Sequence, residues 1–353
     1  MPSERSSGRA AGTAMLPADS APSADLLAVE DLTVEFRSAD GDVRVVDGVS
    51  LRVGEGETLA VLGESGSGKS VSSLAVLGLL PRPAGRVVGG SIRFRGTELT
   101  AVDERVLREL RGERMAMIFQ DPQTALNPVM TVGAQIGEAA RRRRGLSRRA
   151  AREKAIEMMR LVRIPDAERR VDDYPHQFSG GMRQRVVIAM ALALDPELVI
   201  ADEPTTALDV TVQQQIMSLL GELQRSRGVG LVLISHDLGV VAGAADRVVV
   251  MYAGRVVESG PLRPVYDRPA HPYTVGLMRS VPETDGAEPL VPIPGSPPSP
   301  GRLPDGCAFH PRCAMATDRC RVEVPVLRPV EDGRASACHY AEEVQRDGVP
   351  AAG

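Results

Sequence analysis

The chain has 353 residues, of which 43% are hydrophobic and 25% are charged, a composition typical of a globular protein with one large or two ordinary domains. Its formal net charge of −4 provides no general basic field, which argues against a nucleic-acid-binding protein. The longest uninterrupted apolar run, Val186–Leu194, is far shorter than the roughly 20 residues that cross a bilayer, so the membrane-spanning part of any transport system would belong to other chains.

The first elements in chain order are a tail and a pair of strands. Residues 1–25 are mostly small and polar and lack the apolar segment of a signal peptide, so we expect a disordered tail. Leu27–Phe36 and Val43–Val53 alternate apolar and polar residues. This pattern predicts two antiparallel strands joined by a turn at Asp40-Gly41.

The segments that follow alternate strands with helices. Apolar runs predict strands at Leu59–Leu62, Ser91–Arg95, Met115–Phe119, Leu198–Ala201 and Leu231–Ser235, and a terminal hairpin at Arg247–Tyr252 and Arg255–Ser259. Helical periodicity predicts helices at Ser70–Leu80, where Pro81 would end the helix, and at Thr131–Arg144, Arg149–Ile164, Gly181–Leu194 and Val210–Arg227. This order is typical of an α/β protein whose parallel sheet carries helices on both faces.

The segment GESGSGKS lies between a predicted strand and a predicted helix. Its residues are Gly63, Glu64, Ser65, Gly66, Ser67, Gly68, Lys69 and Ser70. The glycines allow consecutive backbone N–H groups to turn inward and bind phosphates. Lys69 would place its charge on the β- and γ-phosphates of a nucleotide, and the Ser70 hydroxyl would coordinate Mg²⁺. The strand before the loop and the helix after it favour this interpretation over a Gly-rich surface loop.

Two further segments, FSGGMRQR at Phe178–Arg185 and VIADEP at Val199–Pro204, follow the phosphate-binding loop. In this order the three segments resemble the ATP-binding cassette (ABC) ATPases. The resemblance implies an ABC ATPase domain over residues 26–260, with a RecA-like core, an antiparallel β subdomain and a helical subdomain at about residues 122–182. It also implies that ATP and Mg²⁺ are bound between the phosphate loop of one subunit and the signature segment, FSGGM, of a second.

The same resemblance assigns catalytic roles, with Lys69, to residues at predicted strand ends. Asp202 would orient Mg²⁺, and Glu203 would be the general base that polarises the attacking water. Gln120, in FQDPQTALNP, would contact Mg²⁺ or water, and His236, in ISHD, would contact the γ-phosphate. Taken singly, such residues more often occupy ordinary loop or structural positions. The phosphate loop and the signature segment favour the functional interpretation.

Five residues are expected to contact ATP bound to the second subunit: Ser179, Gly180, Gly181, Met182 and Asp209. The first of them begin a predicted helix, whose N-terminus attracts an anion. The family more often has LSGGQ, and Met182 lacks the amide of that Gln, which weakens the case for a contact with ribose. Asp209 is also a candidate N-cap of the next helix. Phe36 is a candidate for stacking on adenine, with a core aromatic at a strand end as the alternative.

A narrower resemblance, to the ATPase subunits of oligopeptide/dipeptide importers, rests on FQDPQTALNP, YPHQFSGGMRQR, HPYTVGLM at His271–Met278 and GCAFHPRC at Gly306–Cys313. It implies ATP-driven uptake of peptides or related small solutes, with the chain on the cytoplasmic face of the cell membrane. The partners that it implies are two transmembrane permeases, a second ATPase subunit that is usually a different polypeptide, and an extracytoplasmic solute-binding protein. The groove near Gln120 and the helical subdomain would receive the cytoplasmic helices of the permeases.

Residues 261–353 are expected to form a small irregular extension, which contains all four cysteines: Cys307, Cys313, Cys320 and Cys338. Four cysteines without a secretory signal favour a metal over disulfides, and their spacing matches neither common zinc knuckles nor ferredoxin runs. Some importer ATPases that resemble this chain hold a [4Fe–4S] cluster here, which is our prediction. Zinc, with His310 or His339, and free buried thiols are the alternatives. We expect the site to staple a segment with few apolar residues.

Two other functions compete with transport. A soluble ABC ATPase that acts on ribosomes or DNA is the main alternative, but such proteins usually carry two tandem cassettes or a long coiled coil. The sequence has one phosphate loop, and Phe178 lies only 109 positions after Lys69 with no heptads between them. A regulatory iron–sulfur protein with an inactive cassette is disfavoured by the intact Lys69, Glu203 and His236.

Overall fold

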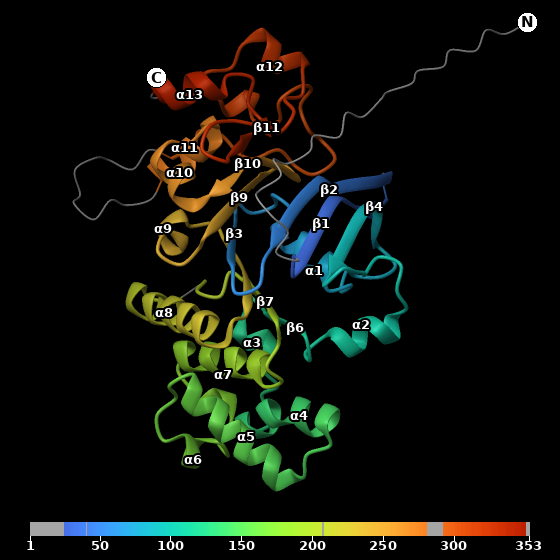
Figure 1. The fold of residues 1–353 in the computed structure, drawn as a ribbon, viewed down its shortest axis with the longest axis vertical. Coiled ribbons are helices and arrows are strands. Elements are labelled where there is room, and N and C mark those ends of the chain that lie inside the picture. Colours follow the sequence, from blue (N-terminus) through green and yellow to red (C-terminus); the bar gives the residue numbers. More distant parts are fainter. Residues whose placement is uncertain (1–24, 40, 207, 281–291, 351–353) are drawn as a thin grey trace, which may run out of the picture.

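Two sheets organise the computed structural model, which describes residues 25–39, 41–206, 208–280 and 292–350 (Figure 1). The larger sheet has eight strands in the order β11-β12-β10-β9-β3-β8-β7-β6. Its strands are β3 (Thr58–Leu62), β6 (Met115–Ile118), β7 (Leu198–Asp202), β8 (Gly230–Ser235), β9 (Arg247–Tyr252), β10 (Arg255–Pro261), β11 (Arg328–Pro329) and β12 (Ala335–Ser336). The five strands from β9 to β6 are parallel, and the other three are antiparallel. This α/β architecture confirms the predicted fold class.

The smaller sheet is antiparallel and packs beside the larger one. Its strands, in the order β2-β1-β4-β5, are β1 (Leu27–Ser38), β2 (Gly41–Val53), β4 (Gly85–Phe94) and β5 (Thr97–Glu98). The helices next to it are α1 (Lys69–Val76) and α2 (Glu104–Leu110). A core of aliphatic side chains joins the two sheets, with Leu32 and Val46 from the small sheet and Val61 and Ile200 from the large one. The strand pair predicted at the start of the chain is confirmed, whereas residues 1–24 of the predicted tail lie outside the described residues.

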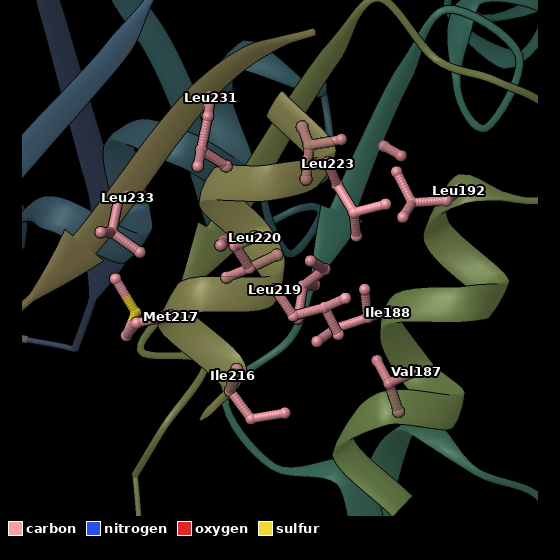
Figure 2. Close-up of a cluster of buried hydrophobic side chains, with 14 of the residues drawn as sticks. Val187, Ile188, Leu192, Ile216, Met217, Leu219, Leu220, Leu223, Leu231 and Leu233 are labelled. Atoms are coloured by element: carbon pink, nitrogen blue, oxygen red, sulfur yellow. The ribbon is translucent and has the colours of Figure 1, made fainter. Parts of the chain in front are cut away.

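A group of helices lies at the end of the molecule opposite the C-terminal extension (Figure 1). Its members and their neighbours are α3 (Pro122–Ala125), α4 (Val132–Arg144), α5 (Arg148–Leu161), α6 (Ala167–Arg170), η1 (Pro175–Gln177), α7 (Gly180–Leu192), α8 (Val210–Arg227) and α9 (Leu238–Val241). Figure 2 shows how Leu219 and Leu220 of α8 lie between Ile188 of α7 and Leu231 and Leu233 of β8. Apolar side chains three and four residues apart place one face of each helix in this core. Helix α7, which begins at the signature segment, is thereby fixed to the sheet both directly, against β6, and through α8.

The C-terminal extension adds two short strands, β12 and β11, to the edge of the larger sheet. Its helices are α10 (Leu262–Asp267), α11 (Pro272–Arg279), η2 (His310–Arg312), α12 (Asp318–Val322) and α13 (Ala341–Asp347). Strand β12 pairs with β10, with Glu258 opposite Ser336. The side chain of Arg334, just before β12, is fully buried and donates hydrogen bonds to the carbonyls of Pro264 and Arg268. The pairing of β12 with β10 thus joins the extension to the sheet, and Arg334 ties segments of the extension to one another.

The structure differs from the sequence prediction at the helix behind the phosphate loop. The predicted stop at Pro81 is wrong, because α1 ends at Val76. Gly78 follows with φ +62°, a left-handed conformation that favours glycine and ends helices. A Cβ atom at Gly78 would also lie 2.7 Å from Leu107 Cδ1 of α2. None of the helices within the described ranges is long and apolar enough to cross a membrane.

Candidate functional site

The phosphate loop joins the carboxyl end of β3 to α1, as its sequence predicts. Gly63 has φ +152°, and a Cβ atom there would lie 2.2 Å from the carbonyl oxygen of Met251, so only glycine fits. Lys69 is buried, and its Nζ donates hydrogen bonds to Gly63 O at 2.6 Å and Glu64 O at 2.9 Å. Burial lowers the pKa of Lys69, and the negative charges of Glu203, Asp202 and Glu64 oppose that shift. The two hydrogen bonds hold the Lys69 ammonium group against the backbone at the start of the loop.

Two oxygen-bearing side chains meet beside this lysine. The Ser70 hydroxyl at the start of α1 donates a hydrogen bond of 3.0 Å to Asp202 Oδ1 at the end of β7. Burial raises the pKa of Asp202, and the hydrogen bond from Ser70 counteracts part of that effect. A carboxylate and a hydroxyl are ligands of the hard-oxygen type that Mg²⁺ prefers. These two residues therefore fit the predicted Mg²⁺ site.

Glu203 is the centre of a second group of side chains. Its Oε2 accepts hydrogen bonds from Gln120 Nε2 at 2.8 Å and from Thr206 Oγ1 at 2.9 Å. Its Oε1 lies 3.3 Å from His236 Nδ1. The backbone of Glu203 has φ +45°, which is uncommon for a residue with a side chain and marks a sharp turn after β7. The structure thus brings together three residues that the sequence placed at separate strand ends.

Thr206 belongs to this group and was missed by the sequence analysis. It follows the predicted general base by three residues, and its backbone N–H also bonds to Glu203 O at 3.2 Å. A hydroxyl residue at this spacing in a turn often bonds back to the chain before it. The sequence Glu203-Pro204-Thr205-Thr206 carried that signal.

The signature segment lies at the start of α7. Ser179 is its N-cap, with Oγ accepting from Met182 N at 3.4 Å, and both Ser179 and Gly180 are exposed. A Cβ atom at Gly181 would lie 2.6 Å from Val212 Cγ1 of α8. Across the described residues no hydrogen bond or ion pair joins this segment to the chain's own phosphate loop. The exposed start of α7 is therefore available to another molecule.

The remaining predicted contacts lie in ordinary structural surroundings. Asp209 is the N-cap of α8, with Oδ1 accepting from Val212 N at 3.0 Å. Phe36 is half-buried near the end of β1, and a Cβ atom at Gly85 would lie 3.0 Å from its ring. Phe178, which replaces the usual Leu, is buried, with the Arg170 guanidinium 5.5 Å from its ring centre. The roles of Asp209 and Phe36 toward ATP stay predictions.

The four cysteines converge in the extension. Cys307, Cys313, Cys320 and Cys338 all line one small cavity of about 20 Å³, together with His310 and His339. Burial raises the pKa of Cys313 to about 11 and that of Cys338 to about 12, and the neighbouring sulfurs add to both shifts. Among the described residues, no three His, Cys, Asp or Glu side chains are arranged to hold a single metal ion.

Comparison with known proteins gives two family matches and close relatives. Residues 46–206 match the ABC transporter family, and residues 257–320 match the C-terminal region of oligopeptide/dipeptide transporters. The chain is 51% identical over 316 residues to the dipeptide transport ATP-binding protein DppD of Escherichia coli, covering 89% of this chain and 96% of that protein. It is 51% identical over 326 residues to a probable peptide ABC transporter ATP-binding protein of Sinorhizobium fredii, covering 92% and 97%.

A solved structure supports the same assignment. The dimeric structure of MJ0796, a bacterial ABC transporter cassette, superposes with a TM-score of 0.60 at 28% identity, covering 67% of this chain and 99% of that one. The phosphate loop, the strand-end carboxylates and the signature segment lie in the cassette part of the chain. The chain therefore belongs to the ATP-hydrolysing, ATP-binding subunits of ABC transporters, in the oligopeptide/dipeptide importer family.

Proposed function

We propose that this chain powers the uptake of di- or oligopeptides, or related small solutes, across the cytoplasmic membrane. The observation that carries the proposal is the convergence of Lys69, Asp202, Gln120, Glu203 and His236 at the carboxyl edge of the sheet. Relatives named for peptide or dipeptide transport support the solute class. Residues 26–260 are the proposed ATPase domain, and residues 261–353 are the proposed extension of the importer family.

The site residues have distinct proposed roles in ATP hydrolysis. Lys69 and the N–H groups of Gly63–Ser70 neutralise and orient the β- and γ-phosphates. Ser70 and Asp202, assisted by Gln120, would hold Mg²⁺, which would offset negative charge on the phosphates. Glu203 polarises the attacking water, and its hydrogen bonds with Gln120 and Thr206 fix the direction of its carboxylate.

His236 and Gln120 would connect the γ-phosphate to the rest of the subunit. His236 is 58% exposed on its side chain, so it can reach a ligand while Nδ1 stays beside Glu203. Gln120 follows the end of β6 by two residues and precedes α3 and the helical region. A change at the γ-phosphate that moves Glu203 would thus also alter the contacts of Glu203 with Gln120 and His236.

The second proposed contact of ATP is with another subunit. Ser179, Gly180, Gly181 and Met182 present the start of a 13-residue helix, whose free N–H groups and dipole attract phosphate. Asp209 lies near this helix start, because Val212, whose N–H bonds to Asp209, packs closely against Gly181. The similar cassette MJ0796 is dimeric, which supports contact with a second subunit. In the importer family the second subunit is usually a different polypeptide.

The helical region would receive the permeases. A cavity of about 330 Å³ lies between α4 and α5, with Glu138, Arg141, Arg152 and Asp172 among its charged lining residues. Val129, at the entrance to α4, is 78% exposed. Exposed apolar and charged groups around one hollow suit a short helix from a partner. The chain would thus sit at the cytoplasmic face of the membrane beside two permeases, with an extracytoplasmic binding protein completing the complex.

The four cysteines of the extension are the proposed site of an iron–sulfur cluster. Four thiols around one cavity suit a [4Fe–4S] cluster, in which each thiolate binds a different iron. A single zinc would instead need its thiolate ligands about 2.3 Å from one point. The raised thiol pKa values mean that the thiolates need a bound cation to form at neutral pH. Zinc remains the alternative occupant.

Uptake of a radiolabelled dipeptide by the source cells tests the proposed function. Disruption of the gene should abolish ATP-dependent uptake, and the native chain supplied in trans should restore it. The Glu203→Gln chain should assemble but fail to restore uptake. Unchanged peptide uptake in the disrupted strain, with a defect in ribosome function or DNA repair instead, would favour the soluble alternative.

A further inference from the structure

Two residues of the C-terminal extension contact the phosphate loop directly. The hydroxyl of Tyr273, on α11, accepts a hydrogen bond of 2.7 Å from the backbone N–H of Glu64. The guanidinium of Arg312 forms a two-pronged ion pair with the Glu64 carboxylate, NH1 to Oε2 at 2.6 Å and NH2 to Oε1 at 3.0 Å. The second residue of the loop is therefore held at both its backbone and its side chain by residues more than 200 positions away.

Both residues are themselves fixed in place. The Arg312 side chain is only 5% exposed, and its Nε donates to Pro294 O at 2.8 Å. Its guanidinium lies 5.8 Å from the ring centre of Tyr252 and 5.9 Å from that of Phe309. The centre of the Tyr273 ring lies 4.6 Å from that of the Tyr252 ring and 5.4 Å from that of the Phe309 ring. A buried aromatic cluster of Tyr252, Tyr273 and Phe309 thus supports both contacts with the loop.

The charge of Glu64 reaches the nucleotide site. Burial lowers the pKa of Lys69, the residue placed to bind the phosphates, and the Glu64 carboxylate is one of the charges that oppose this shift. An unpaired carboxylate at this position would oppose a triphosphate by like-charge repulsion. A two-pronged Arg–carboxylate pair with restricted exposure offsets that charge and fixes the direction of the side chain.

We infer that Tyr273 and Arg312 are positioning residues for ATP: they hold and neutralise Glu64, so that the extension sets the affinity of the phosphate loop for nucleotide. The inference rests on the proposed role of Gly63–Ser70 as the phosphate loop. Arg312 directly precedes Cys313, and Phe309 lies between Cys307 and Cys313 in sequence. A change in the position of Cys313 would therefore also move Arg312 and its ion pair with Glu64 in the loop.

A double-variant cycle on the full chain tests the inference, with binding of the fluorescent analogue MANT-ATP as the readout and circular dichroism as the check on folding. Arg312→Gln leaves the Glu64 carboxylate unpaired, so affinity should fall by about tenfold. Adding Glu64→Gln removes that carboxylate, so the double variant should return to within about twofold of the native chain. Tyr273→Phe keeps the ring but removes the acceptor of the Glu64 N–H, and it should also weaken binding.

Two controls separate the possible failures. Arg319→Gln removes an arginine of the same extension that pairs with Glu323 at 2.7 Å on the surface, and it should leave affinity unchanged. Lys69→Ala should abolish binding; native affinity in that variant would refute the phosphate-loop assignment itself. If Lys69→Ala behaves as expected, native affinity in Arg312→Gln, or a loss that Glu64→Gln does not relieve, would overturn the inference.

Discussion

The carboxylate of Glu203 accepts a hydrogen bond of 2.8 Å from the side-chain amide of Gln120, although 83 positions separate the two residues. The contact exists because β6 and β7 are parallel neighbours, with Ile118 opposite Ala201, so that the chain after each strand emerges at the same edge. Open parallel sheets bind ligands at this edge. The Gln120–Glu203 pair therefore marks the place where ATP chemistry and the helical region meet.

Replacement of Ser70 by Ala should remove the Mg²⁺ dependence of ATP binding. The variant loses the hydroxyl that contacts Asp202 at 3.0 Å, one of the proposed oxygen ligands. ATP affinity in the presence of Mg²⁺ should fall by about tenfold, or roughly 1.4 kcal/mol, whereas affinity in EDTA should be unchanged. Calorimetric titrations with and without Mg²⁺ measure both values. An equal loss in the two buffers would mean that Ser70 acts on the loop and not on the metal.

The two signature glycines should respond differently to alanine. A Cβ atom at Gly181 would lie 2.6 Å from Val212, and overpacking of this kind costs about 1–3 kcal/mol. A Cβ atom at Gly180 would lie an ordinary 3.7 Å from Leu208. In urea unfolding of the isolated chain, Gly181→Ala should lower the free energy of unfolding, and Gly180→Ala should leave it unchanged or raise it. The opposite order would show that α7 and α8 pack differently.

The stability of the chain should fall as the pH rises through neutrality because of Glu258. This residue is fully buried, near Arg334 and beside His271, and its Oε1 accepts from Ala270 N at 2.7 Å while its Oε2 has no partner. Burial raises its pKa from 4.5 to about 7. The folded state therefore prefers the protonated acid. Its contribution is fully present below pH 4.5 and is lost as the pH rises through about 7.

The isosteric variant Glu258→Gln checks this effect. It keeps an acceptor for Ala270 N but cannot ionise. Near pH 5 it should match the native chain, and at pH 8 it should be more stable by up to about 3 kcal/mol. Urea unfolding at the two pH values measures the difference. A native chain whose stability is equal at both values would contradict the predicted ionisation.

Loss of one cysteine should affect the extension and, through it, the nucleotide site. Cys338→Ser removes one of the four thiols that line the shared cavity. On anaerobically purified protein, we expect four irons and four acid-labile sulfides per native chain and neither in the variant. ATP affinity of the variant should fall as it does for Arg312→Gln. One zinc per native chain and no sulfide would make the site a zinc staple and exclude an iron–sulfur cluster.

The sequence predicted well the strands and helices that carry the proposed site residues. Val210–Arg227 forms the predicted helix, ended by Gly228 in a left-handed conformation, because its signals lie within the segment itself. Lys69, Asp202 and His236 follow or end apolar runs that become neighbouring strands. The stop of α1 at Val76 was mispredicted, because Gly78 adopts the left-handed conformation where Leu107 of α2 packs against it.

Contacts between distant segments could not be predicted in this way. The motif that contains His271 and Tyr273 was noted as a family signal, but its physical role lies in a hydrogen bond to Glu64, 209 positions earlier. Arg312 and Glu64 are 248 positions apart. Nothing in the composition or periodicity of either segment indicates its partner, since the pairing depends on where the extension packs on the sheet.

Single-turnover ATP hydrolysis by the assembled transporter carrying Glu203→Gln is the decisive test of Glu203 as the general base. ATP should still bind with native affinity, because Lys69 and the phosphate loop are intact, and it should hold the two ATPase subunits together. Hydrolysis should slow by about 10²–10⁴-fold, the contribution expected of a positioned general base. An undiminished rate of hydrolysis in the variant would show that Glu203 is not the general base.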